Sequence, residues 1–168
     1  GVEPLAPATR PIVLGVAVYD WLPNREGFDW FVREVWPHVR RAVPNAELHL
    51  VGKLSDEALK RQWSQTPGVR CLGRVGDLRA AYQSALFTIA PLFGGGGTNI
   101  KVIESLAYGR CCVVTPSAAK GFEKMDGLHI ASDANEFSSK CEELLRNVGS
   151  TGLAGGAAAH RAGQCFSF

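Results

Sequence analysis

Short apolar segments alternate with amphipathic segments from residue 12 onward, and this alternation is typical of a parallel β-sheet whose strands are joined by helices. Six apolar or β-branched segments have the length of buried strands. They are residues 12–19, 46–51, 69–72, 86–91, 111–115 and 128–131. Because crossovers between parallel strands are nearly always right-handed, the pattern predicts an α/β fold with a doubly wound, mostly parallel sheet and helices on both of its faces.

The segment between the first two predicted strands has one apolar face at helical spacing, and arginines occupy its other face. The apolar positions are Phe28, Phe31, Val32, Val35, Val39 and Ala42. Pro37 interrupts this pattern, and proline lacks the amide hydrogen that a regular helix needs. We therefore expect a kink at Pro37 or two short helices joined there.

Further helices are predicted over residues 56–63, 77–85, 99–108 and 134–147. The last of these has a capping pattern at its start, because Glu136 follows Asp133 at a spacing of three. Together, the six strands and their helices predict a Rossmann-like domain. Ligands of such domains bind at the carboxyl ends of the strands, so the loops there are the candidates for chemistry.

The chain of 168 residues, 46% of them hydrophobic, is long enough for one well-packed core. We expect the Rossmann-like domain to span residues 12–148. Residues 1–11 are punctuated by prolines and begin with Gly1 rather than methionine, so we expect them to be a linker from a domain outside this sequence. Residues 149–168 are rich in glycine and alanine, and we expect a C-terminal tail with a short helix.

The charge and cysteine content narrow the class of protein. Lys plus Arg number 18 and Asp plus Glu 16, and the resulting net charge of +2 does not favour binding of a polyanion such as DNA. No apolar run is long enough to span a bilayer. The five cysteines, at positions 71, 111, 112, 141 and 165, lack a CxxC spacing and are interpreted as reduced core residues of a cytoplasmic protein.

Several kinds of catalytic site have no support in the sequence. The four histidines are scattered and form no HxxxH or HExxH array, so no metal site is predicted. No serine or cysteine lies in a GxSxG pattern, and no Asp-x-Asp pair is present to hold a divalent ion against a diphosphate.

Four consecutive glycines, Gly94 to Gly97, stand between a predicted buried strand and a helix. Glycine lets the backbone approach a ligand closely, and the start of the next helix offers unpaired amides to an anion. Thr98 or Asn99 would cap that helix, and Lys101 in its first turn could reach a phosphate. The run thus predicts a diphosphate-binding loop. It is not a Walker P-loop, and the alternative is a loop that only turns the chain.

Glu104 follows Lys101 by three residues and therefore lies on the same face of the predicted helix. A carboxylate at this place can accept hydrogen bonds from a vicinal diol such as a ribose. It can equally form an ion pair with Lys101 on a solvated surface. The spacing alone does not separate these two interpretations.

Two further loops lie at the predicted ligand edge of the sheet. One of them, after the first strand, contains Asp20, Asn24 and Arg25. The Asn24 side chain could simply hydrogen-bond the backbone of its own turn. Gly73, Arg74 and Val75 follow the third strand, and the main-chain groups of Arg74 and Val75 could contact a nucleobase. Arg74 could instead meet a phosphate or remain a surface charge. Asp77 is interpreted as the cap of the next helix.

Three segments resemble the carboxyl-terminal, donor-binding domain of the GT-B fold glycosyltransferases of family 4, known as glycosyl transferases group 1. They are residues 20–27, residues 50–52 together with 69–75, and residues 95–109, which lead to 113–115 and 120–122. In order and spacing the resemblance covers almost all of residues 12–147. The third segment is the most specific of the three.

The resemblance implies a nucleotide-sugar site in this half of an enzyme. By resemblance, the donor diphosphate is bound by Gly95, Gly96, Gly97, Thr98, Asn99 and Lys101, the ribose by Glu104, and the base by Gly73, Arg74 and Val75. The family transfers a sugar from a UDP- or GDP-linked donor to an acceptor hydroxyl with retention of configuration, usually without a metal, and no other cofactor is implied. It also needs an amino-terminal acceptor domain, so this chain alone is expected to bind donor and transfer nothing.

Two departures from the family pattern concern the donor. Gly96 stands where many members carry a second glutamate at the donor sugar, and Arg25 is the only basic residue where many carry a pair. A second interpretation is therefore a nucleotide-binding module without catalysis, and a third is a flavodoxin-like interaction domain without a ligand. The resemblance also allows the whole enzyme a peripheral position at the inner face of a membrane.

Overall fold

The computed structural model describes residues 2–95 and 100–165, and its centre is a sheet of six parallel strands in the order β3-β2-β1-β4-β5-β6. The strands are β1 (Ile12–Val16), β2 (Glu47–Val51), β3 (Val69–Gly73), β4 (Phe87–Ala90), β5 (Cys112–Val114) and β6 (Leu128–Ile130). All six predicted strands and the predicted fold class are confirmed. The strand β1 ends at Val16, before the expected end at residue 19.

The strand order reverses between β1 and β4, which are neighbours in the sheet although two strands separate them in the chain. Val13 of β1 pairs with Leu48 of β2 on one side and with Phe87 of β4 on the other. The connections that leave β1 and β4 therefore diverge toward opposite halves of the sheet. This divergence opens a crevice at the carboxyl ends of the two strands, where such folds bind ligands.

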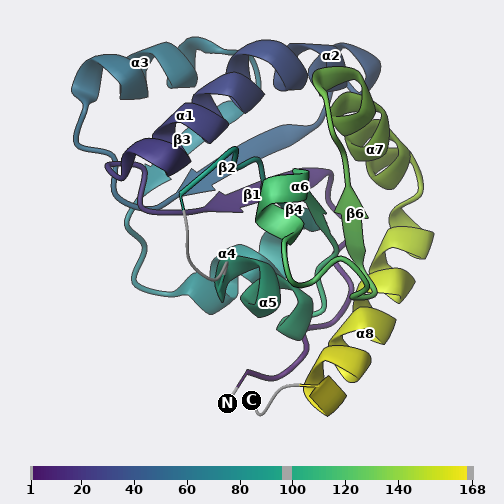
Figure 1. Ribbon diagram of the computed structural model, residues 1–168. Coiled ribbons are helices and arrows are strands. Elements are labelled where there is room, and N and C mark those ends of the chain that lie inside the picture. The colour runs from purple at the N-terminus through teal and green to yellow at the C-terminus, as the bar shows by residue number, and fades with distance from the viewer. Residues whose placement is uncertain (1, 96–99, 166–168) are drawn as a thin grey trace.

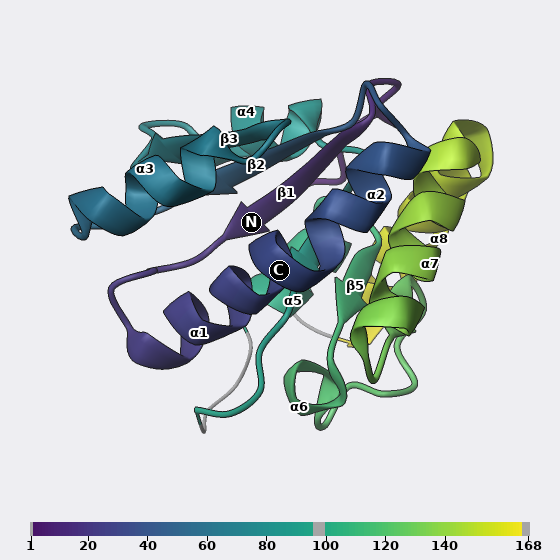
Figure 2. The same cartoon turned by 90° about the horizontal axis from the view of Figure 1, so that it is seen from above.

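Helices cover both faces of the sheet (Figures 1 and 2). One face carries α1 (Leu22–Trp30), α2 (Trp36–Ala42), α3 (Glu57–Gln65) and α7 (Ala134–Arg146). The other carries α4 (Leu78–Ser84), α5 (Ile100–Ala107) and α8 (Val148–Cys165), and the short α6 (Pro116–Ala119) follows β5. The two layers have separate cores: Trp36 and Phe137 belong to the first, and Leu14 and Tyr82 belong to the second.

The predicted interruption near Pro37 is confirmed. A five-residue π-helix, η1 (Phe31–Val35), joins α1 to α2, and Pro37 lies in the first turn of α2 directly after this change of helical hydrogen bonding.

The helix α1 also corrects an expectation about the loop after β1. Residues 22–27 are helical, so Asn24 and Arg25 lie on a helix rather than in a loop. Pro23 in the first turn presets the backbone for a helix start, and the buried Phe28 fixes the helix against the sheet.

Aspartates cap three of the helices. Asp56, Asp77 and Asp133 accept a hydrogen bond from the amide three residues on, at 3.0, 3.3 and 2.8 Å respectively. The predicted caps at Asp77 and Asp133 are therefore confirmed. Each bond satisfies one of the amides that a helix start leaves without an intrahelical partner.

The helix α8 is longer than the sequence suggests. Where we expected a tail with a short helix, 18 residues form one helix that packs against α5. Small side chains make this possible: Ala158 and Ala162 are buried against Leu106, and a Cβ on Gly155 would lie 2.2 Å from the Gly109 carbonyl oxygen. The backbones approach closely enough that large apolar side chains are not needed. No helix of the described ranges is long and apolar enough to cross a membrane.

Candidate functional site

Two adjoining cavities lie at the carboxyl ends of β1, β2 and β4. The central cavity, between β1 and β4, has a volume of about 230 Å³, and the outer cavity, beside β1, β2 and the segment after β3, has a volume of about 350 Å³. Val16, Ala17, Val18 and Lys101 line both of them. The structure thus places a cavity at the strand reversal that the fold predicts as its ligand-binding edge.

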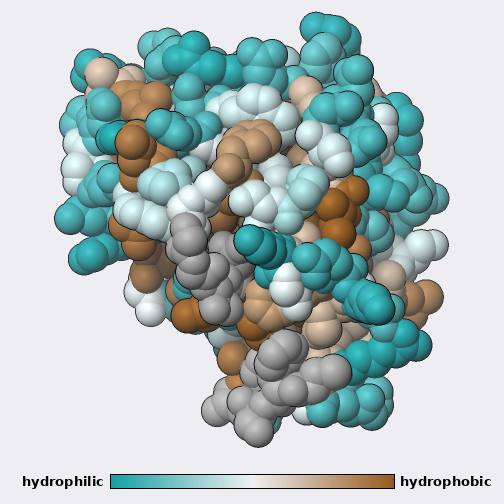
Figure 3. Space-filling model, in the orientation of Figure 1, coloured by the Kyte–Doolittle hydropathy of each residue, from teal (hydrophilic) through white to brown (hydrophobic). Residues whose placement is uncertain are grey.

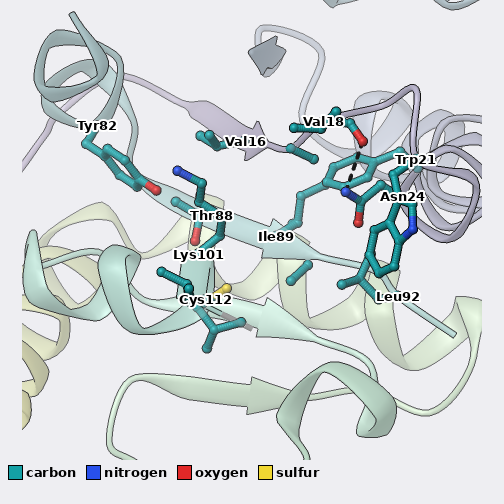
Figure 4. A pocket seen from close by; sticks show the side chains of 15 residues that line it. Val16, Val18, Trp21, Asn24, Tyr82, Thr88, Ile89, Leu92, Lys101 and Cys112 are labelled. Carbon is teal, nitrogen blue, oxygen red and sulfur yellow. Dashed lines mark hydrogen bonds between the residues drawn. The ribbon is translucent and has the colours of Figure 1, made fainter. Parts of the chain in front are cut away.

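The walls of the central cavity are mostly apolar, and its polar groups are few (Figure 4). Apolar side chains come from β1, α1, β4 and the segment after β4, among them Val16, Phe28, Ile89 and Leu92. Figure 4 shows the ammonium group of Lys101 pointing toward the Tyr82 end of the cavity, whereas Trp21 and Asn24 lie at the other end. Pockets of this kind, apolar with a few placed polar groups, are typical of small-molecule sites.

Lys101 and Glu104 form a pair on α5. The Lys101 Nζ lies 3.3 Å from Glu104 Oε1, and the same oxygen accepts a hydrogen bond of 2.9 Å from the Tyr82 hydroxyl. Among the described residues, Glu104 Oε2 has no hydrogen-bond partner. Of the two interpretations that the spacing left open, the ion pair is therefore formed. Glu104 itself is not among the described residues that line either cavity, although its bonded partners Lys101 and Tyr82 are among those that line the central one.

Tyr82 has no place in the predicted site, and the structure reveals it as the second partner of Glu104. Its side chain is buried between α4 and α5, and its ring stacks on that of Tyr108 at a centroid distance of 4.5 Å. Burial, and then the negative charge of Glu104, raise the pKa of Tyr82, so its hydroxyl remains a hydrogen-bond donor. Tyr82 occupies an apolar position of a helical pattern, and nothing in the sequence distinguishes it from an ordinary core residue.

The segment after β3 faces Lys101 across the outer cavity. Arg74 and Val75 are exposed and line this cavity, and Gly73 ends β3 in the left-handed conformation at a φ of +66°. The Gly73 carbonyl oxygen accepts a hydrogen bond of 2.8 Å from the Gly52 amide, which fixes the start of the segment to the end of β2. The structure thus brings the predicted base-binding segment and Lys101 to one cavity.

The three candidate residues after β1 lie in different places. Asn24 lines the central cavity, and its Nδ2 donates a hydrogen bond of 3.0 Å to the Val18 carbonyl oxygen. Asp20 is held by Ser55, whose amide donates to Oδ1 at 2.7 Å and whose hydroxyl donates to Oδ2 at 2.6 Å. Arg25 is not among the described residues that line either cavity.

The predicted diphosphate loop is described only at its ends. Gly96, Gly97, Thr98 and Asn99 lie outside the described residues. At the first end, Gly95 has a φ of +78°, and a Cβ there would lie 2.7 Å from the ring of Trp21. At the other end, Lys101 lies in the first turn of α5.

Exposed apolar side chains surround the two cavities. Val18, Trp21, Phe93 and Ile100 are between 48% and 66% exposed. Figure 3 shows brown, hydrophobic surface toward the left of the view, the side at which β1 and β2 end. The edge of the sheet that carries the cavities thus exposes several large apolar side chains, which is typical of a ligand-binding or protein-binding surface.

The predicted core position of the cysteines is confirmed for three of them, whereas Cys71 is free but only partly buried. Cys111, Cys112 and Cys141 are buried and free, and burial raises the pKa of the Cys112 thiol to about 12. Within residues 2–95 and 100–165, no group of three or more histidine, cysteine, aspartate or glutamate side chains is arranged to hold a metal ion.

The family of the chain follows from its sequence match. Residues 10–147 match the family model described as glycosyl transferases group 1. The chain belongs to this family. A comparison with curated proteins finds no match. The expected resemblance is confirmed over nearly the whole of the domain that carries the two cavities.

Solved glycosyltransferase structures share the fold. TarM of S. aureus, in complex with fondaparinux, alpha-GlcNAc-glycerol and UDP, is 16% identical with a TM-score of 0.74 over 96% of this chain and 33% of that one. Sucrose-phosphate synthase of Thermosynechococcus elongatus is 21% identical with a TM-score of 0.73, over 95% and 42%. HepE of Anabaena, in complex with UDP and glucose, is 13% identical with a TM-score of 0.73, over 94% and 44%. This chain therefore spans less than half the length of each.

Proposed function

We propose that this chain binds the nucleotide-sugar donor of a retaining glycosyltransferase, which transfers the sugar to an acceptor hydroxyl. One observation carries the proposal: Lys101 lines both cavities, with Glu104 bonded to it and with Arg74 and Val75 across the outer cavity. These are the residue types that a nucleoside diphosphate needs: a cation for phosphate, a carboxylate for a diol, and a main-chain segment for a base.

Each part of the donor has its own place in this proposal. The base lies against residues 73–75 in the outer cavity, and the ribose hydroxyls donate to Glu104. The diphosphate lies between Lys101 and the segment from Gly95 to Asn99, and the sugar extends into the central cavity. Lys101 is the one charged residue among the described residues that line the central cavity, and Gly96 stands where many members of the family carry a glutamate at the donor sugar.

The chemistry that this half contributes is stabilisation of the leaving group. As the bond between the sugar and the diphosphate breaks, negative charge develops on the departing nucleoside diphosphate. The Lys101 ammonium group and the dipole of α5 stabilise that charge, and such electrostatic effects are usually the largest catalytic contribution. No metal or other cofactor takes part in the proposed reaction.

The remaining parts of the enzyme belong to a second domain. The similar structures are more than twice as long as this chain, which supports an acceptor domain connected through residues 1–11. The exposed apolar side chains around the cavities suit the wall of an interdomain cleft. Alone, the chain binds donor without transferring sugar. The whole enzyme works in the cytoplasm, and a lipid-linked acceptor would place it peripherally at the inner face of a membrane.

Calorimetric titration of this chain with UDP and with GDP tests the proposal. We expect one of the two nucleotides to bind, and Lys101→Ala and Glu104→Ala each to weaken binding about tenfold or more, because each removes a charged partner of the ligand. Lys140→Ala is the matched control, since Lys140 pairs with Glu143 of α7 at the same spacing, 3.0 Å apart.

The outcomes separate the three interpretations of the sequence. Binding that only the two α5 substitutions weaken supports the donor site, and the preferred base identifies the donor class. Transfer activity of this chain alone would contradict the need for a second domain. If neither nucleotide binds at millimolar concentration, the donor-site proposal is wrong for this chain, and an interaction domain becomes the better interpretation.

A further inference from the structure

We propose that Tyr82 positions Glu104 for the ribose, holding the carboxylate in place when Lys101 turns to the diphosphate. This inference rests on the proposed function and assigns a role to a residue outside the family motif. The two bonds at Glu104 Oε1 carry it: 2.9 Å from the Tyr82 hydroxyl and 3.3 Å from Lys101 Nζ.

Lys101 has two competing anionic partners once a nucleotide binds. Its side chain is 46% exposed and lies at both cavities, so the ammonium group is free to move toward a diphosphate. If Lys101 were the only partner of Glu104, its departure would release the carboxylate to several rotamers. Binding of the ribose would then have to order the glutamate side chain again, and the lost rotamer freedom would weaken the affinity.

Tyr82, by contrast, is held in place and does not move toward a bound nucleotide. Its side chain is 1% exposed, its ring stacks on Tyr108 at 4.5 Å, and its carbonyl oxygen accepts a hydrogen bond of 2.9 Å from Arg110 Nε. Both the ring and the backbone of Tyr82 are thus fixed by neighbours outside the cavities. A hydroxyl on so rigid a support keeps Glu104 Oε1 in one position.

The geometry also determines which oxygen the ribose meets. Since the Tyr82 bond falls on Oε1, the second oxygen, Oε2, is the one left open to a ribose hydroxyl. When Lys101 leaves, Oε1 regains room for the second hydroxyl of the diol. Tyr82 therefore acts on the ribose through Glu104, although its ring also lines one end of the central cavity.

The test compares UDP with 2′-deoxy-UDP, or the corresponding guanine pair if guanine is preferred, in calorimetric titrations of the chain and of Tyr82→Phe. We expect Tyr82→Phe to weaken UDP binding about tenfold, because a hydrogen bond to a charged group is lost. The affinity ratio of UDP to 2′-deoxy-UDP should fall in the same variant, since a Glu104 carboxylate that is not held in place forms weaker hydrogen bonds with the ribose hydroxyls. A role in packing alone would weaken both nucleotides equally and leave that ratio unchanged.

Tyr108→Phe is the control, because it removes a hydroxyl from the stacked ring without touching Glu104. Glu104→Ala should lower the affinity ratio of UDP to 2′-deoxy-UDP to about one. Adding Tyr82→Phe to Glu104→Ala should not change that ratio again, as expected for two residues that act through one contact. An unchanged ratio in Tyr82→Phe, with UDP still bound and Glu104→Ala still impaired, would overturn this inference and leave the proposed function standing. Failure of the unaltered chain to bind either nucleotide would overturn both.

Discussion

Arg110 donates a hydrogen bond of 2.8 Å to the carbonyl oxygen of Ala6, a residue 104 positions away in the chain. The guanidinium group is buried, and its other bonds in the described ranges also go to carbonyl oxygens, those of Tyr82, Gln83 and Gly109. One side chain thus ties the segment before β1 to the end of α4. It also supports the backbone of the residue that contacts Glu104.

The first prediction concerns this arginine. Arg110→Met keeps much of the apolar volume but removes the four hydrogen bonds that the guanidinium group donates to carbonyl oxygens. We expect it to lower the free energy of unfolding by about 2–4 kcal/mol, the combined cost of these lost charge-assisted bonds. Urea denaturation measures the difference. A loss below about 1 kcal/mol would mean that water replaces the guanidinium group.

The second prediction compares two helical glycines. A Cβ on Gly27 of α1 would lie 1.9 Å from the Pro91 carbonyl oxygen, whereas Gly156 of α8 has open space around the same position. Gly27→Ala should therefore separate α1 from the end of β4 and destabilise the protein by about 2 kcal/mol or more. Gly156→Ala should instead stabilise it by up to about 1 kcal/mol through helix propensity. Thermal unfolding of the two variants should move in opposite directions.

The third prediction concerns pH and Asp20. The hydroxyl and the amide of Ser55 hold the pKa of Asp20 below its ordinary value of 3.8. A lowered pKa means that the unfolded chain takes up the proton first, so this contribution to stability is complete above the unfolded value and is lost as the pH falls through the folded one. The Tm of the protein should thus exceed that of Asp20→Asn at pH 7, and the difference should shrink below about pH 4.

A control for this pH effect is available at the partner residue. Ser55→Ala removes only the hydroxyl donor and keeps the amide bond to Oδ1, so its difference in Tm should be smaller and should shrink over the same pH range. A difference between the protein and Asp20→Asn that stays constant from pH 7 to pH 3 would contradict the assignment to this carboxylate.

The fourth prediction separates binding from folding at α5. Lys101 and Glu104 are 46% and 23% exposed, and a partly exposed pair at this helical spacing contributes only about 0.2–0.5 kcal/mol to stability. Lys101→Ala should therefore leave the midpoint of urea unfolding almost unchanged while it weakens nucleotide binding. A large loss of stability would show that Lys101 has a structural role and that its effect on binding is indirect.

The sheet was predictable because its strands obey local rules. Buried parallel strands such as β4 are nearly continuous apolar runs, in which Thr88 is the polar exception, and the caps at Asp77 and Asp133 depend on residues only three apart. Both signals lie within a short window of sequence. The doubly wound arrangement, with helices on both faces, followed from the general handedness of crossovers and required no knowledge of individual contacts.

The contacts that were not predictable join residues distant in the chain. Tyr82 reaches Glu104 across 22 positions and Asp20 reaches Ser55 across 35, and no local pattern marks either pair. The helix α8 was missed for a different reason, because glycine and alanine favour no core face in a hydrophobicity pattern. The helix α1 begins at Leu22, earlier than the apolar pattern from Phe28 indicated. Pro23 is compatible both with a turn and with the first turn of a helix, so the sequence did not mark this start.

The glycine content of α8 affects the order in which the elements of the molecule unfold locally. Five glycines among its 18 residues make the isolated segment a poor helix, so α8 persists because it is docked on α5. Its amides should exchange with solvent in local openings well before those of β1 and β4 at the centre of the sheet. Since α5 carries Lys101 and Glu104, a bound nucleotide that steadies α5 should slow hydrogen exchange in α8, a helix that lines neither cavity.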